Sequence, residues 1–136
     1  MIHDEICTYE VCKLAKERGF NVQTFDWYDY TGNYHKGFIP HELQECPRYK
    51  EYYAPAQSLL QRWLREEKGV VVEAIAQPTC STSKKNCYWW SIKQNSDGFC
   101  YQYEECSYIL YSDEGYFDRY ELALEDAIKY ALEKLV

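Results

Sequence analysis

The sequence predicts an α+β fold in which helices pack on one face of a mainly antiparallel sheet. Three stretches place apolar residues at helical spacing, and between them lie runs of aromatic and β-branched residues bounded by glycine-containing turns. Aromatic residues make up 18% of the chain, which favours wide sheet surfaces. The length of 136 residues suits a single domain over residues 1–136, with the order α-β-β-α-β-β-β-α.

The first helix is expected in "TYEVCKLAKERGF", residues 8–20. Thr8 can cap its start, and Gly19 can end it. The aromatic run "FNVQTFDWYDY" predicts a strand over residues 20–30, and "TGN" predicts a turn into a second strand, "YHKGF". Residues 40–54 contain two prolines and several charges, so we expect an irregular loop there, or a segment that holds a short helical turn.

The second helix is expected in "APAQSLLQRWLREEKG", with Pro55 at its first helical position and Gly69 at its end. Its apolar stripe consists of Leu59, Leu60, Trp63 and Leu64. The following run, "VVVEAIA", predicts a strand. Its nearly continuous apolar character favours a central position in the sheet.

The last third of the chain predicts a strand-rich segment and a final helix. "NCYWWSIKQ" and "FCYQYEE" are expected to form a hairpin through "NSDG", and "SYILY" is expected to add a further strand. The third helix begins at "DRYE", where Asp118 and Glu121 have the spacing of a capping box, and it runs almost to the end of the sequence.

The charge balance argues against a nucleic-acid binder. Lys and Arg number 15 against 22 Asp and Glu, which gives a net charge of −7. The order α-β-β-β-α in the second half also occurs in double-stranded RNA binding domains, but the last helix begins with acidic residues that would repel phosphates, among them Asp118 and Glu121. The composition favours a protein partner with a basic surface, such as a nucleic-acid-associated protein.

The seven cysteines are an odd number, and the first residues have no apolar signal-peptide core. No run approaches the roughly 18 apolar residues that span a membrane. We therefore expect a cytoplasmic protein with free thiols and no membrane association.

No sequence motif identifies a catalytic centre, a phosphate cradle or a cofactor site. His35, His41 and Cys46 could together hold a metal, but the chain lacks the closely spaced ligand pairs of structural zinc sites, so we expect neither metal nor cofactor. An enzyme, a small-ligand binder or a metal-binding domain with a cleft formed by residues 40–54 remains the alternative.

Trp89 and Trp27 are the candidate interface residues. In the strand "CYWWSIK", alternation places Trp89 on the face opposite the core-facing residues Tyr88, Trp90 and Ile92. A large exposed aromatic side chain can anchor a protein interface. The alternative is that the loop of residues 77–85, or a homodimer partner, covers Trp89. Trp27 belongs to the same class, since its strand has apolar residues on both faces.

Two segments, "QSLLQ-x-WLREE" before a valine strand and "YELALEDAIKYALEKL" at the end, resemble those of small proteins from Bacteroidota genomes, their phages and mobile elements. "YEVCKLAKERGF" with the following aromatic strand and "TGN" turn is similar to the start of those proteins. The resemblance implies a bacterial or phage cytoplasmic setting. It implies no catalytic or binding residue, because no activity is established for the family.

The function that these observations favour is a non-enzymatic accessory protein that acts by protein–protein interaction.

Overall fold

A computed structural model describes residues 5–37, 39, 51–77, 87–94, 108–111 and 117–136. Within these residues the helices are α1 (Tyr9–Glu17), α3 (Gln57–Lys68) and α4 (Tyr120–Lys134). The short strands β1 (Trp27–Tyr28), β2 (Tyr34–His35) and β3 (Tyr52–Tyr53) form one sheet. The strands β4 (Val70–Gln77), β5 (Cys87–Gln94) and β6 (Tyr108–Tyr111) form the other.

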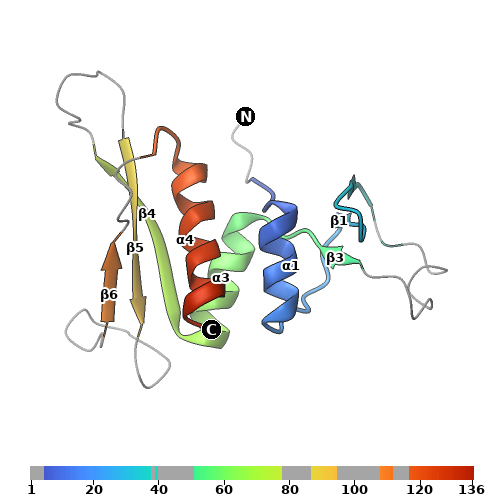
Figure 1. Ribbon diagram of the computed structural model, residues 1–136, viewed down its shortest axis with the longest axis horizontal. Coiled ribbons are helices and arrows are strands. Elements are labelled where there is room, and N and C mark those ends of the chain that lie inside the picture. Colours follow the sequence, from blue (N-terminus) through green and yellow to red (C-terminus); the bar gives the residue numbers. More distant parts are fainter. Residues whose placement is uncertain (1–4, 38, 40–50, 78–86, 95–107, 112–116) are drawn as a thin grey trace.

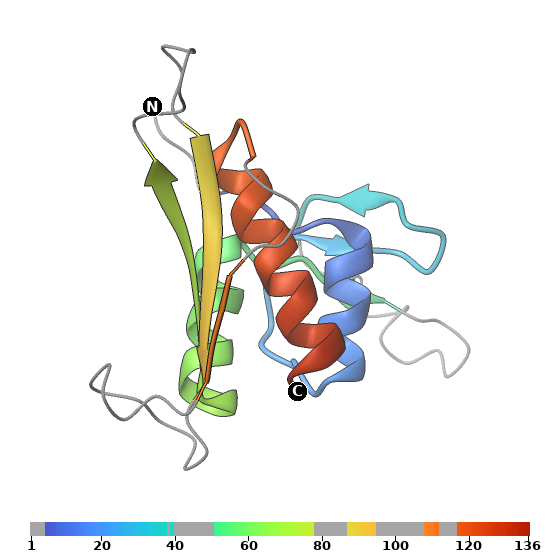
Figure 2. The same cartoon turned by 60° about the vertical axis from the view of Figure 1, so that its left-hand side comes forward.

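The predicted α+β class is confirmed, and every strand pair in the described residues is antiparallel. The strands are divided between two sheets, ordered β2-β1-β3 and β4-β5-β6. Figure 1 shows the layers from left to right: the larger sheet, then α3 and α4, then α1, then the small sheet. Figure 2 shows α3 and α4 on the same side of the larger sheet, as the sequence predicts.

Helix α1 forms where the sequence predicts it. Thr8 takes the cap position, and its hydroxyl oxygen accepts a hydrogen bond from the Val11 amide at 3.4 Å. Gly19 follows the helix at a φ of 101°, a backbone conformation that glycine adopts without steric cost. Helix α3 ends in the same manner at Gly69, with a φ of 66°.

Two predicted helix starts are wrong in detail. Helix α3 begins at Gln57 with Ala56 as its cap, so Pro55 lies before the helix and not at its first position. Helix α4 is capped by Arg119 without a side-chain hydrogen bond, so the capping box from Asp118 does not form.

The incoming chain explains the position of the α4 cap. Phe117 is held against Tyr88 by two backbone hydrogen bonds of 2.7 and 2.8 Å, and Asp118 lies between this bridge and the Arg119 cap.

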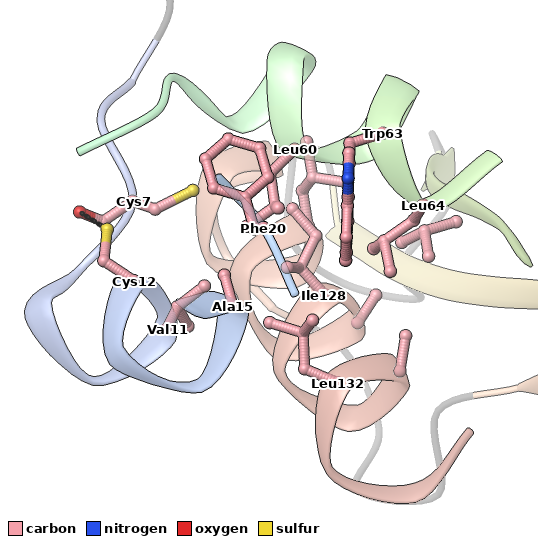
Figure 3. Close-up of a cluster of buried hydrophobic side chains, with 14 of the residues drawn as sticks. Cys7, Val11, Cys12, Ala15, Phe20, Leu60, Trp63, Leu64, Ile128 and Leu132 are labelled. Atoms are coloured by element: carbon pink, nitrogen blue, oxygen red, sulfur yellow. Dashed lines mark hydrogen bonds between the residues drawn. The ribbon is translucent and has the colours of Figure 1, made fainter. Parts of the chain in front are cut away.

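The core lies between the helices and the larger sheet. In Figure 3 apolar side chains of α1, α3 and α4 meet, with Phe20 packed edge to face on Trp63 at a centroid distance of 5.4 Å. Leu60, Leu64, Ile128 and Leu132 are each 0% exposed. The sheet contributes one face of β4 and β5, because alternate residues such as Val72 and Ile92 point toward the helices.

Strand β4 lies at an edge of its sheet within the described residues, although the sequence favoured a central position. The central strand is β5, which pairs with β4 and with β6. The apolar run of β4 reflects burial under α3 and α4 and carries no information about strand order.

Strand β3 is an unexpected element, since residues 40–54 were predicted to be a loop. Its partner is β1, with Trp27 opposite Tyr53. Residues 40–50 of that predicted loop, and the predicted strand "FCYQYEE" with its "NSDG" turn, lie outside the described residues.

A polar network joins the chain start, α3 and α4. The Glu125 carboxylate accepts hydrogen bonds from the Thr8 amide and hydroxyl, at 2.8 and 2.9 Å, and from the Gln57 amide at 2.7 Å. Gln57 is 3% exposed and also donates to the Glu121 carbonyl at 2.9 Å. The network therefore satisfies a buried amide and fixes the α1 cap against α4.

Candidate interaction surface

The face of the larger sheet that points away from α3 and α4 is the candidate interaction surface, and we call it the outer face. Strand alternation and the β4–β5 register determine its members. Ile75 lies directly opposite Trp89, with Glu73 opposite Ser91 and Val71 opposite Lys93. Figure 2 shows this face on the left of the larger sheet, and none of the described helices lies against it.

The two ends of the outer face differ in burial. Ser91 is 2% exposed and Lys93 is 8% exposed, so the face is covered at that end. Ile75 and Trp89 are half-buried. The Lys93 ammonium lies 3.2 Å from the Glu73 carboxylate, which neutralises the buried charge. The other end, which we call the open end, consists mainly of the half-buried pair Ile75 and Trp89, and the two ends differ in the burial of their β5 residues.

The structure places Trp89 on the face that alternation predicts, opposite the core residues Trp90 and Ile92. Trp90 is buried under α4, where its indole nitrogen donates to the Asp126 carboxylate at 2.8 Å. Neighbouring tryptophans in one strand thus have different environments, one in the core and one on the outer face.

Trp27, the other candidate, is 4% exposed and does not present its ring to solvent. It stacks on the His35 ring with a centroid distance of 4.3 Å and an interplanar angle of 16°. The small sheet explains this burial, because β1 is its central strand and has neighbours on both sides. The structure does not bring Trp27 and Trp89 together, since they lie in different sheets.

The hairpin between β1 and β2 is organised by Asp29. Its carboxylate accepts hydrogen bonds from the Thr31 amide and hydroxyl and from the Asn33 amide, and its other oxygen lies 2.8 Å from the His35 ring nitrogen. The Thr31 hydroxyl, then His35, holds the pKa of Asp29 well below its usual range. These contacts account for the predicted "TGN" turn, and we assign them a structural role.

Two hollows lie on either side of Lys16, between α1 and the small sheet. One has a volume of about 320 Å³ and the other about 470 Å³. Strand alternation in β3 gives one tyrosine to each, Tyr53 to the smaller and Tyr52 to the larger. The Lys16 ammonium donates to the Glu51 carbonyl at 2.7 Å and lies 5.2 Å from the centre of the Tyr52 ring. Sequence reasoning missed these hollows, because the two-residue strand β3 is too short to give an alternating pattern.

The two described cysteines with placed side chains, Cys7 and Cys12, are buried thiols. Burial, with a smaller contribution from the Glu125 carboxylate, raises the pKa of the Cys12 thiol to about 12. Its thiol donates to the Cys7 carbonyl at 3.6 Å. Both behave as small core residues, and Cys12 has too little thiolate at neutral pH to act as a nucleophile.

Among the described residues, no group of three histidine, cysteine or acidic side chains is arranged to hold a metal ion. His41 and Cys46, which the sequence offered together with His35, lie outside the described residues. The described part of the chain contains no helix that combines the length and the apolar character needed to cross a membrane.

Comparison with protein-family models, with curated proteins and with solved structures finds no match to this chain.

Proposed function

We propose that the protein is a non-enzymatic accessory protein that acts by binding another protein through the open end of its outer face, with Ile75 and Trp89 at the centre. The observation that carries this proposal is the placement of these two side chains. They lie directly opposite each other on neighbouring strands and are half-buried, on a face without a described helix.

The chemistry of this pair fits an interface anchor. Tryptophan combines a large apolar area with few rotatable bonds, and it is enriched among residues that dominate binding energy. Ile75 supports the Trp89 ring from the neighbouring strand, because directly opposite side chains on one sheet face are in contact range. A ring packed against a neighbouring strand loses less side-chain entropy on association than a freely rotating one.

The charge of the chain favours a partner with a basic surface. The net charge is −7, and the Glu73 carboxylate lies beside the apolar pair on the same face. Lys93 compensates Glu73, so the attraction comes mainly from the wider acidic surface and affects the association rate. We place this interaction in the bacterial or phage-infected cytoplasm, with a nucleic-acid-associated protein as the partner.

The experiment is a comparative affinity capture from a bacterial lysate with the wild type and two variants. Trp89→Ala removes the anchor, whereas Leu122→Ala removes an apolar side chain that is 45% exposed on α4. A protein retained by the wild type and by Leu122→Ala, but lost with Trp89→Ala, supports the proposal. If both variants retain the partner equally, Trp89 is not an anchor of the interface. Circular dichroism confirms that both variants are folded.

A second candidate function rests on the two hollows beside Lys16. Aromatic rings and an ammonium group there favour a small acidic aromatic compound. Nuclear magnetic resonance with benzoate-type compounds distinguishes the two candidates. Shifts at Asn21 and Tyr53, with none at Trp89, would favour the ligand-binding function.

Direct binding to nucleic acid is disfavoured by the net charge of −7. A gel shift of nucleic acid by the protein that weakens with added salt would support nucleic-acid binding.

A further inference from the structure

One edge of β4 faces away from β5, and the structure shows which backbone groups point out of the sheet there. Residues directly opposite each other in an antiparallel pair exchange either both of their backbone hydrogen bonds or neither. Ala76 lies opposite Tyr88. Tyr88 uses its amide and its carbonyl on Phe117, at 2.8 and 2.7 Å. The amide and carbonyl of Ala76 therefore point away from β5, toward the outer edge.

A second contact gives the same alternation. The Gln61 side-chain amide of α3 donates to the Val72 carbonyl at 2.6 Å, so that carbonyl also points toward the outer edge. Because backbone direction alternates along a strand, Ala74 between them points outward as well. Gln61 covers the edge at Val72. In the described part of the chain, no hydrogen bond reaches the outward groups of Ala74 or Ala76.

We propose that this edge binds a second copy of the chain, with the two β4 strands antiparallel about a two-fold axis at Ile75. The Ala74 amide and carbonyl then exchange hydrogen bonds with the second copy's Ala76. By symmetry, Ala76 exchanges hydrogen bonds with the second copy's Ala74. This register uses the outward groups of both alanines and leaves the Gln61 contact to Val72 in place. The two larger sheets become one continuous sheet.

The sequence around the axis is self-complementary. The segment "EAIAQ", residues 73–77, pairs Ile75 with the second copy's Ile75 and Glu73 with its Gln77, so no two acidic residues meet. An axis at Glu73 would place two carboxylates opposite each other, which is destabilising. An axis at Ala74 would pair Val72 with the second copy's Ala76, and this pairing would need the Val72 carbonyl that already accepts a hydrogen bond from Gln61. The same surface patch serves both copies, as a two-fold interface requires.

The inference goes beyond the proposed function, because it concerns the assembly of the chain and uses backbone groups of β4. It would also bring the Ile75–Trp89 pairs of both copies onto one continuous outer face.

Ala76→Pro tests the edge directly. Proline removes the outward amide of Ala76, and an edge strand tolerates proline where its amide points out of the sheet. Ala76→Ser keeps the amide and is the matched control, since Ala76 is exposed. Sedimentation equilibrium up to about 1 mM chain should show a dimer for the wild type and the serine variant. The proline variant should dimerise about 30-fold more weakly or not at all.

Amide hydrogen exchange gives a second measurement that does not depend on a variant. The amides of Ala74 and Ala76 should exchange more slowly as the wild-type concentration rises, whereas the Ile75 amide, which points toward β5, should not change. A wild type that is monomeric at about 1 mM would overturn the proposal. A proline variant that dimerises like the wild type, or concentration-independent exchange at both alanines, would also overturn it.

Discussion

Replacing Glu125 by alanine should destabilise the fold, although Glu125 lies far in sequence from the groups that it holds. The change removes the acceptor of three hydrogen bonds, from the Thr8 amide, the Thr8 hydroxyl and the Gln57 side chain. It therefore removes the hydrogen bonds between the start of α1 and α4 and leaves a buried amide with one acceptor fewer.

The magnitude follows from the exposure of each donor. Thr8 is exposed, so water replaces the lost acceptor, and each of its bonds contributes about 0.5–1 kcal/mol. Gln57 is 3% exposed and keeps the Glu121 carbonyl, so its lost bond to a charged group contributes about 1 kcal/mol. The free energy of unfolding should fall by about 2–3 kcal/mol in total.

Urea unfolding followed by tryptophan fluorescence measures this change, with the slope of the transition checked for two-state behaviour. Glu133→Ala is the control, because Glu133 is exposed on the same helix and should change the free energy by less than about 0.5 kcal/mol. If Glu125→Ala costs no more than this control, the network does not join α1 to α4 as described.

Two further predictions concern ionisable groups. Because the pKa of Asp29 is held below its unfolded value, its stabilising contribution is present above about pH 4 and is lost as the pH falls further. The difference in unfolding free energy between the wild type and Asp29→Ala should therefore shrink between pH 6 and pH 3, and a constant difference would contradict this reasoning. Burial and a pKa of about 12 should protect Cys12 from alkylation at pH 8 until the chain unfolds. Peptide mass mapping after iodoacetamide treatment checks this, and rapid labelling of Cys12 in the folded protein would refute it.

The elements that the sequence predicted well are those whose signals are local. Thr8 and Gly19 limit α1, Gly69 ends α3, and alternation in β5 separates Trp89 from Trp90. Each of these depends on residues within one turn or one strand of each other.

The features that the sequence did not predict depend on distant residues. β3 exists because Tyr52 and Tyr53 pair with β1, and a strand of two residues is too short to show an alternating pattern in the sequence. The edge position of β4 was missed because buried edge strands and central strands have the same apolar pattern. Trp27 was taken for an interface residue because its burial depends on the His35 ring and on the strands beside β1.

A binding titration with the purified partner tests most directly whether the outer face binds another protein. The account predicts that Trp89→Ala raises the dissociation constant by about 30-fold or more, as expected for the loss of a central anchor, while Leu122→Ala leaves it within about twofold. A dissociation constant that is the same for the wild type and Trp89→Ala would contradict the account.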